Sequence, residues 1–244
     1  MVERGNLENI WRTLLSKLGL DRSYRKVFAI GFNKTATTSI HSVFTGCGLT
    51  AAHSILWRDS RHPLVHWPYQ AFSDGIPNDF TRLDQRFPNS RFILNTRDLT
   101  EWLDSRLEHI AKAQAAGRPT WKNWQKTEAA IVRWVHRRNE HHAKVLRYFA
   151  DRPQDLLVVN FIRDPQAASR IAAFIGKDPP PERPYTHSLR TGRRQGELSN
   201  RELIESALTS EAIPPADWSN DLFCPSLGAV DDLPPDTSAF TSAQ

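Results

Sequence analysis

A lysine and a run of hydroxyl side chains directly after a short apolar segment are the residues of this chain best suited to binding an anion. The apolar segment 27–30 ends at Gly31, and Lys34 follows three residues later. Four hydroxyl side chains come next and precede an amphipathic segment: Thr35, Thr37, Thr38 and Ser39. This order predicts a strand, a loop and a helix whose first amide groups carry partial positive charge. With the lysine and hydroxyl donors added, the turn is predicted to bind a phosphate or sulfate group.

The spacing around Lys34 does not match the nucleotide-binding P-loop. In the pattern G-x-x-x-x-G-K-[ST] a glycine directly precedes the lysine, whereas this chain has Asn33 there. The stretch GFNKTATTS resembles instead the 5′-phosphosulfate loop, P-K-S-G-T-T, of the sulfotransferases that use 3′-phosphoadenosine 5′-phosphosulfate (PAPS). The matching residues are Lys34, Thr35, Ala36, Thr37 and Thr38. The resemblance implies that the loop 33–38 holds the 5′-phosphate, with Ala36 in place of a glycine that adopts a positive φ more readily.

A second strand-loop-helix pattern lies at residues 91–106. An apolar strand at 92–94 is followed by polar residues and then by apolar residues at helical spacing. In the same sulfotransferases an arginine at the strand end and a serine eight residues later hold the 3′-phosphate, and Arg97 and Ser105 have this spacing. A guanidinium and a hydroxyl so placed can converge on one phosphate. The alternative is a surface pair of Arg97 with a carboxylate such as Glu101, but two motifs in the family's order favour the phosphate site.

A third basic segment, RTGRRQG at residues 190–196, is loosely similar to the sulfotransferase loop R-K-G-x-x-G, which closes over the 3′-phosphate. This similarity implies that Arg190 and Gly192 contact the cofactor. Gly192 and Gly196 are one residue further apart than in that pattern. A solvated basic loop is therefore the alternative interpretation.

The resemblance also implies roles in catalysis. Lys34 would stabilise charge on the bridging oxygen as the phosphate leaves, and a base must take the proton of the acceptor. In the family this base is often a histidine just after the third strand, slightly more than twenty residues before the 3′-phosphate arginine. Asp74, 23 residues before Arg97, occupies this place, and burial can raise the pKa of a carboxyl group toward neutrality. His53, at the end of the second predicted strand, is the rival candidate, and Asp74-Gly75 is also an ordinary turn dipeptide.

Five apolar segments that alternate with helical patterns must position these residues. The predicted strands are 27–32, 49–53, 69–73, 92–96 and 156–161. The alternation predicts an α/β fold in which a parallel sheet of about five strands is flanked by helices. The resemblance implies the P-loop NTPase-like architecture of the sulfotransferases. One long helix is predicted over 121–149, and another from Pro165 to about Gly176.

Length and composition predict a single domain followed by a tail. A chain of 244 residues can bury one large core. The domain is predicted to span 1–210, with an amphipathic helix at 4–19 docked on it. The tail, 211–244, contains six acidic residues, five prolines and no Lys or Arg. Three of its apolar residues predict partial docking: Trp218, Leu222 and Phe223.

Without the tail the chain is distinctly basic. Residues 1–210 carry 32 basic and 21 acidic side chains, a net charge of +11. Such a balance attracts polyanions. No helix-turn-helix, zinc-finger or RNA-binding strand motif is visible in the sequence, so no nucleic-acid partner is predicted. PAPS, which carries phosphates at both ends, accounts for the charge as well.

The histidines and cysteines predict no metal site. His62 and His66 have the spacing of a helical zinc pair but lack the glutamate of H-E-x-x-H and enclose a proline. The basic segment 136–142, which includes Arg138 and His142, is predicted to be a solvated helix face. Two cysteines give no disulfide framework, which fits a cytoplasmic protein. No apolar run approaches the roughly 20 residues of a membrane span.

The predicted activity is transfer of a sulfuryl group from PAPS to a hydroxyl or amine of a small-molecule or glycan acceptor, without a metal. Acceptor pockets are formed by variable loops such as 54–68 and 113–120, so sugars, phenols, lipids and antibiotic scaffolds all stay open, as does the oligomeric state. Two alternatives remain. One is a small-molecule or nucleotide kinase of the P-loop type, which needs Mg²⁺ and a Walker lysine, and the other is a non-catalytic binder of nucleotides or polyanions.

Overall fold

The computed structural model describes residues 4–21, 23, 25–118, 125–180 and 199–227. The chain divides into two compact units, which are described separately below. The first comprises 1–96, 148–186 and 236–244, and the second comprises 97–147 and 187–235. The proposed division into a domain ending at residue 210 and a tail stays a prediction.

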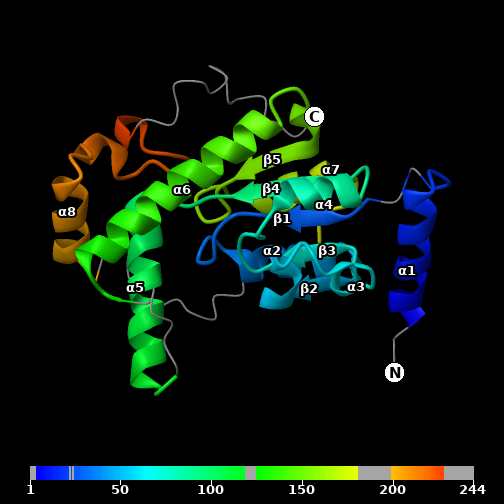
Figure 1. Ribbon diagram of the computed structural model, residues 1–244, viewed down its shortest axis with the longest axis horizontal. Helices are drawn as coiled ribbons and strands as arrows, with labels where there is room; N and C mark the ends of the chain where they lie inside the picture. Colours follow the sequence, from blue (N-terminus) through cyan, green and yellow to red (C-terminus); the bar gives the residue numbers. More distant parts are fainter. Residues whose placement is uncertain (1–3, 22, 24, 119–124, 181–198, 228–244) are drawn as a thin grey trace. The chain divides into compact units, whose positions relative to one another are not determined.

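The first unit is built on one sheet of five parallel strands (Figure 1). The strands are β1 (Val27–Ala29), β2 (Ala51–His53), β3 (Ala71–Ser73), β4 (Arg91–Asn95) and β5 (Leu156–Val159). Their order across the sheet is β2-β3-β1-β4-β5, and every adjacent pair is parallel. Each strand overlaps one of the segments predicted to be strands, so the predicted α/β fold is confirmed. The chain leaves β1 toward β2 and leaves β4 toward β5, so these two adjacent strands flank the topological switch point of the sheet.

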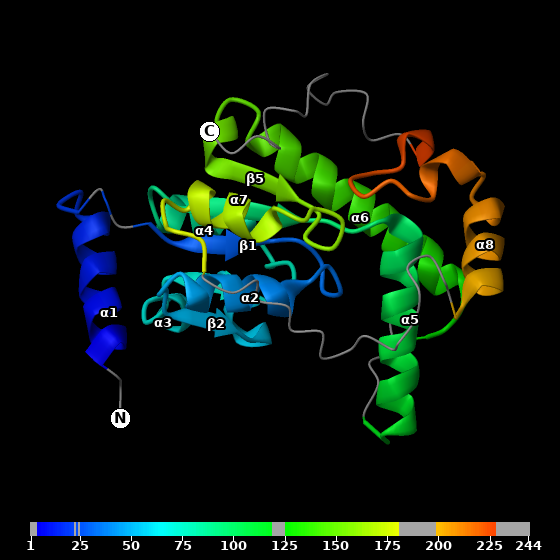
Figure 2. The same ribbon diagram turned by 180° about the vertical axis from the view of Figure 1, so that it is seen from behind.

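One face of the sheet is covered by α2 (Thr37–Gly46) and α7 (Ala167–Phe174) (Figure 2). Buried aliphatic side chains from both helices and from the strands form this core, among them Val27, Val43 and Ile171. Fully burying an aliphatic side chain of this size contributes about 1.5 to 3 kcal/mol. The packing therefore fixes α2, and with it the loop that precedes it, against β1. The helix predicted from Pro165 is confirmed by α7.

The opposite face of the sheet is aromatic. Phe28 of β1 stacks on Phe72 of β3 and on Phe92 of β4, with ring centroids 4.9 and 5.4 Å apart. Trp57 is fully buried beside them, and its Nε1 donates to the carbonyl oxygen of Ser73 at 2.6 Å. This hydrogen bond anchors the segment after β2 to the end of β3. The short helical elements of the first unit are the 3₁₀ turns η1 (Ile55–Arg58) and η2 (Pro153–Asp155) and the helices α3 (Pro63–His66) and α4 (Phe80–Arg86).

The predicted N-terminal helix is present as α1 (Arg4–Lys17), and it buries a polar face. Its most buried side chains are Asn9, Thr13 and Ser16. Asn9 Nδ2 donates to the carbonyl oxygen of Pro68 at 3.3 Å. The large apolar side chains that it exposes, by 58 to 60%, are Leu7 and Trp11. This first-unit helix is therefore held through polar groups and presents apolar side chains to solvent.

The second unit is helical in its described residues. Its elements are α5 (Leu99–Ala115), α6 (Glu128–Tyr148, whose last residue belongs to the first unit), α8 (Arg201–Ser210) and the 3₁₀ turns η3 (Pro215–Asp217) and η4 (Pro225–Leu227). The long helix predicted over 121–149 is present as α6 but begins only at Glu128, and residues 121–124 lie outside the described residues. The predicted solvated face on this helix is wrong for Arg138 and His142, which are each 2% exposed. Within the described parts of the chain, no helix has the length and apolarity needed to cross a bilayer.

Candidate active site

Gly31 brings the end of β1 into direct contact with the end of β4. Its amide donates to Asn95 Oδ1 at 2.9 Å. A Cβ atom at this position would lie 2.0 Å from the carbonyl oxygen of Asn95, far inside van der Waals contact. Glycine is therefore required here by the close approach of another backbone. The contact lies at the switch point of the sheet, outside whose strand ends open α/β sheets bind their ligands.

The loop after Gly31 passes twice through left-handed backbone conformations. Lys34 has a φ of 70° and Ala36 a φ of 65°, a region that costs a residue other than glycine about 1 to 2 kcal/mol. Between them Thr35 is 3% exposed. Its hydroxyl donates to the carbonyl oxygen of Phe32 and accepts from Asn95 Nδ2. Because its only hydroxyl proton is used inside the loop, the Thr35 side chain fixes the shape of the loop.

The loop leads into the N-terminus of α2, which no side chain caps. Ala36 is the N-cap residue and makes no side-chain hydrogen bond. The first helical bond joins Ile40 N to Ala36 O at 3.0 Å, so the amides of Thr37, Thr38 and Ser39 have no acceptor within the helix. Thr38 is exposed, whereas Thr37 is buried. The amides, the lysine and the Thr38 hydroxyl together form a turn rich in donors, which suits a tetrahedral anion.

A polar cluster lies where β2 and β3 end. His53 is the last residue of β2, and Asp74 directly follows β3. His53 Nδ1 lies 2.9 Å from Ser73 Oγ, and His53 Nε2 lies 3.9 Å from Asp74 Oδ1. Arg58 Nη2 lies 3.3 Å from Asp74 Oδ2 and also donates to the main-chain oxygen of Asp74. The two side chains predicted as rival bases are therefore neighbours in one cluster, which also contains an arginine.

The backbone at Asp74 is strained. Its φ is 107°, and that of Gly75 is 103°. A residue other than glycine in such a region costs on the order of 1 to 3 kcal/mol and persists only where its surroundings hold it. The hydrogen bond from Arg58 to the Asp74 carbonyl supplies such a restraint. The strained turn and the arginine together keep the carboxylate near His53.

The electrostatics of the cluster keep His53 neutral near pH 7. Burial lowers the pKa of His53, the charge of Asp74 offsets part of this shift, and the charge of Arg58 lowers the pKa again. Burial, and then the proximity of His53, lower the pKa of His41, whose ring centroid is 5.3 Å from that of His53. A neutral imidazole keeps one ring nitrogen as a proton acceptor. The side chain of His53 is 28% exposed, so a molecule bound at this end of the sheet can reach the ring.

Arg97 and Ser105, the residues predicted to bind the 3′-phosphate, lie in the second unit. Arg97 precedes the first residue of α5 by two positions, and Ser105 lies in the second turn of this helix. Arg97 Nε is 3.4 Å from Glu101 Oε2, so the ion pair considered as the alternative is present. Both side chains of the pair are partly exposed, at 21% and 18%. Since a guanidinium carries five N–H donors, this pair and a phosphate contact do not exclude each other.

Three residues of the site were not predicted from the sequence: Arg58, His41 and Asn95. Only Asn95 carries a signal that sequence analysis can use, because it is a polar residue at the end of an apolar strand. The predicted cofactor contacts Arg190 and Gly192 lie outside the described residues. In the part of the chain that the structure describes, no group of three or more His, Cys, Asp and Glu side chains is arranged to hold a metal ion.

Comparison with known proteins adds a family match. A family model described as a sulfotransferase domain matches residues 64–192, which is more than half of the 244 residues. The matched range contains Asp74, Arg97 and Ser105 and begins after the loop 31–38. No curated protein and no solved structure gives a significant match.

Proposed function

Because the chain belongs to the sulfotransferase domain family, we propose that it transfers a sulfuryl group from PAPS to a hydroxyl or amine of a small-molecule or glycan acceptor. Family membership indicates sulfuryl transfer in general. The donor is proposed from the loop 31–38, whose lysine, amides and Thr38 hydroxyl form a donor-rich turn at the N-terminus of α2. This loop is the observation that carries the proposal, since it lies outside the matched range and is independent of it.

The donor set of the loop fits the phosphosulfate end of PAPS. The groups proposed to contact the anion are all hydrogen-bond donors or cations: Lys34, the Thr38 hydroxyl and the amides at the start of α2. When bound, PAPS supplies a sulfuryl group whose bond to a phosphate oxygen breaks as the bond to the acceptor forms. Thr35 supports the loop from behind and is not proposed to contact the phosphate. Its hydroxyl proton is used by the carbonyl of Phe32.

We assign Lys34 to the stabilisation of the leaving phosphate. Its ammonium is a compact point charge on the strained turn that opens α2. Charge that develops on an oxygen beside such a group is stabilised more strongly in the transition state than in the ground state. The residue therefore acts mainly on the rate of transfer and less on the affinity for the nucleotide.

His53 is proposed as the base that takes the proton from the acceptor. In the tautomer that donates Nδ1–H to Ser73 Oγ, Nε2 carries the lone pair. Asp74 lies 3.9 Å from this nitrogen, where its charge stabilises the imidazolium formed by proton uptake. Asp74 is also paired with Arg58, whose Nη2 lies 3.3 Å from Asp74 Oδ2. The three residues act together: His53 accepts the proton, Asp74 stabilises it, and Arg58 holds Asp74.

Arg97 and Ser105 are proposed to hold the 3′-phosphate. The proposal rests on their spacing, on the position of Arg97 just before α5 and on the match of the family model across both residues. A charge-assisted contact from a guanidinium is among the stronger hydrogen bonds that a protein offers to a phosphate. Arg190 and Gly192 remain proposed further contacts to the cofactor.

The proposal is tested by a panel of nucleotides followed by a transfer assay. We expect adenosine 3′,5′-bisphosphate to raise the Tm more than adenosine 5′-phosphate or ATP with Mg²⁺ at equal concentration. Radiolabelled sulfuryl from PAPS should then appear on members of an acceptor panel that includes sugars, phenols and long-chain alcohols. A preference for ATP with Mg²⁺ would favour the kinase instead. Tight binding of the bisphosphate with no transfer to any acceptor would favour a non-catalytic binder.

A further inference from the structure

The C-terminal strap, residues 217–224, caps the N-terminus of α5. Leu99 N donates to the carbonyl oxygen of Asn220 at 3.1 Å, and Thr100 N donates to that of Trp218 at 3.2 Å. Asp98, the N-cap residue of α5, makes no side-chain cap of its own. Two amides at the start of this helix therefore donate to main-chain carbonyls from a distant part of the sequence. These two amides are not available to an anion.

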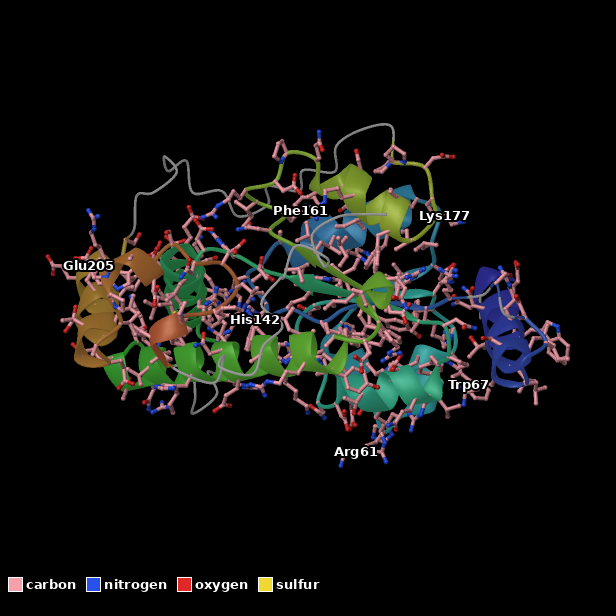
Figure 3. All side chains as sticks on the ribbon, turned by 90° about the horizontal axis from the view of Figure 1, so that it is seen from above. Arg61, Trp67, His142, Phe161, Lys177 and Glu205 are labelled. Carbon is pink, nitrogen blue, oxygen red and sulfur yellow. The ribbon has the colours of Figure 1, made fainter. Side chains whose placement is uncertain are left out.

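One face of α6 fixes the strap in place. Asn139 and Cys224 are joined by two hydrogen bonds, from Asn139 Nδ2 to Cys224 O at 2.9 Å and from Cys224 N to Asn139 Oδ1 at 3.0 Å. His142, labelled in Figure 3, lies on the same helix. Its Nδ1 is hydrogen-bonded to the carbonyl oxygen of Leu222. Both α6 side chains are 2% exposed. Since buried polar groups of this kind are costly to leave without partners, the strap is an integral part of the second unit.

Arg138 joins the strap to the residue before α5. Its Nη2 donates to the carbonyl oxygen of Asn220 at 2.9 Å and to that of Arg97 at 3.2 Å. The guanidinium also lies over the ring of Trp102, 5.9 Å from its centroid. One buried side chain therefore restrains both the main chain of Arg97 and the carbonyl that caps the first turn of α5.

Burying the charged side chain of Arg138 costs folding free energy, which a purely structural role does not explain. It is 2% exposed, and burial lowers its pKa to about 10, so it remains charged at neutral pH. The nearby acidic groups Asp98 and Asp221 compensate part of this charge. A well-packed apolar side chain in place of a buried ion is often neutral or stabilising. An apolar residue at this position could not donate a hydrogen bond to the carbonyl oxygen of Arg97, and this bond is what the arginine adds.

We propose that Arg138 is a positioning residue for recognition of the 3′-phosphate, because it holds the main chain of Arg97 against the C-terminal strap. The inference rests on the proposed function, in which Arg97 and Ser105 contact that phosphate. With the amides of Leu99 and Thr100 already bonded to the strap, recognition depends on side chains. The direction of the Arg97 side chain is in turn set by the backbone that Arg138 restrains.

The test compares affinities for two nucleotides in three variants. The readout is the ratio of the Kd for adenosine 5′-phosphate to the Kd for adenosine 3′,5′-bisphosphate, which isolates the 3′-phosphate from the rest of the ligand. Arg138→Met, which keeps the volume but not the donors, should lower this ratio at least tenfold. Arg138→Lys should restore only part of it, since an ammonium cannot reproduce the planar guanidinium. Asn139→Ala, which removes the hydrogen bonds to Cys224 at the end of the strap and keeps both Arg138 bonds, should lower the Tm and keep the ratio.

The outcomes separate the inference from the function on which it rests. If Arg97→Ala abolishes the preference for the bisphosphate while Arg138→Met keeps it, Arg138 is merely structural and the inference is wrong. If neither variant changes the ratio, Arg97 does not bind the 3′-phosphate, and the inference that depends on this contact is wrong with it. Should Arg138→Met not fold, hydrogen exchange on the unmodified protein decides. Slow exchange of the Leu99 and Thr100 amides, with and without the bisphosphate, is expected, and fast exchange in the bound state overturns the proposal.

Discussion

The two strand-loop-helix turns, β1–α2 and β4–α5, treat the first amides of their helices in opposite ways. At α2 the N-cap is an alanine, and the amides of the first turn have no acceptor within the helix. At α5 the amides of Leu99 and Thr100 are bonded to carbonyls of the C-terminal strap. In the proposed function, the first turn therefore binds its anion through backbone amides, whereas the second binds its phosphate through side chains.

This difference predicts where each turn is sensitive to substitution. A site made of amides depends on the path of the main chain, which at β1–α2 is set by Gly31, Asn95 and two left-handed residues. A site made of side chains depends on the identity of a few residues, chiefly Arg97. Backbone substitutions should therefore damage the first turn, and charge substitutions should damage the second.

Lys34 is the exception at the first turn, because its role is proposed to lie in the chemical step. Lys34→Ala should lower kcat about 100- to 1000-fold, the loss expected for a group that stabilises developing oxyanion charge, with a much smaller change in the Kd for PAPS. Lys34→Arg should rescue poorly, since a broad fork does not replace a point charge in a tight loop. Single-turnover kinetics give both quantities. A change confined to the Michaelis constant would make the lysine a simple phosphate anchor.

Arg97 tests the side-chain site of the second turn. Arg97→Ala should weaken binding of adenosine 3′,5′-bisphosphate by about 2 to 4 kcal/mol, the scale for loss of one partner of a hydrogen-bonded charge pair, and leave adenosine 5′-phosphate nearly unchanged. Calorimetry measures both affinities. The matched control is Glu101→Gln, which removes the carboxylate 3.4 Å from Arg97 Nε and should tighten the bisphosphate. Equal losses for both nucleotides in Arg97→Ala would refute the assignment.

Gly31 tests the backbone site of the first turn. Gly31→Ala forces a Cβ into the Asn95 carbonyl, at 2.0 Å before relaxation, and should cost about 1 to 3 kcal/mol of unfolding free energy together with nucleotide affinity. Gly48→Ala is the control, because a Cβ at Gly48 would have no neighbour within 4 Å, and the cost there comes from its positive φ of 76° alone. It should lower stability by about 1 kcal/mol without changing affinity. Equal effects of both variants on nucleotide affinity would show that the close contact of Gly31 with Asn95 does not determine binding.

The pH dependence of kcat/KM tests whether His53 is the base beside the first turn. Burial lowers the pKa of His53, so the acidic limb of the profile should lie below the ordinary histidine range near 6.5. Asp74 raises this pKa and Arg58 lowers it. Asp74→Asn should therefore move the limb to lower pH and Arg58→Gln to higher pH, each by up to about one unit. A nearly inactive Asp74→Asn beside a mildly impaired His53→Ala would instead make Asp74 the base.

The smallest expected effect compares the two N-cap residues directly. Ala36 has a φ of 65°, where glycine is unstrained, and Asp98 has a φ of −47°. Ala36→Gly should raise the unfolding free energy by about 0.5 to 1 kcal/mol. Asp98→Gly should lower it, because no strain is relieved and the charge near Arg138 is lost. Chemical denaturation with nucleotide absent measures both, and the same sign for both would contradict the strain at Ala36.

Local pattern was enough to predict the sheet and the first turn. Short apolar runs ending in polar residues located each strand of the described sheet, and the residues of the loop 33–38 alone predict a turn that binds an anion. The pairing of His53 with Asp74 was beyond such reasoning, because it depends on β2 lying next to β3. From their spacing along the chain, the two residues were alternative candidates for the base. The order of the strands places them next to each other.

The burial of Arg138 and His142 could not be predicted for a related reason. Helical periodicity assigns charged side chains to solvent, and the acceptors that bury these two belong to residues 220 and 222, about eighty positions further on. No local pattern marks a main-chain carbonyl as an acceptor for a distant helix. Sequence analysis detects the apolar faces of a helix. It misses polar faces that are buried because their side chains form hydrogen bonds with the backbone of a distant segment.

The strap also has a consequence for the order in which the protein forms. The amide of Thr100 and the carbonyl of Trp218 that it meets are 118 residues apart in the sequence. Contacts of such separation close late, because the entropy of a long loop must be overcome before they contribute. During synthesis, β1, the loop 31–38 and α2 emerge long before the strap does. The first turn of α5 can therefore receive its two capping carbonyls only after Asn220 has been synthesised, whereas the loop 31–38 and α2 need no residue of the strap.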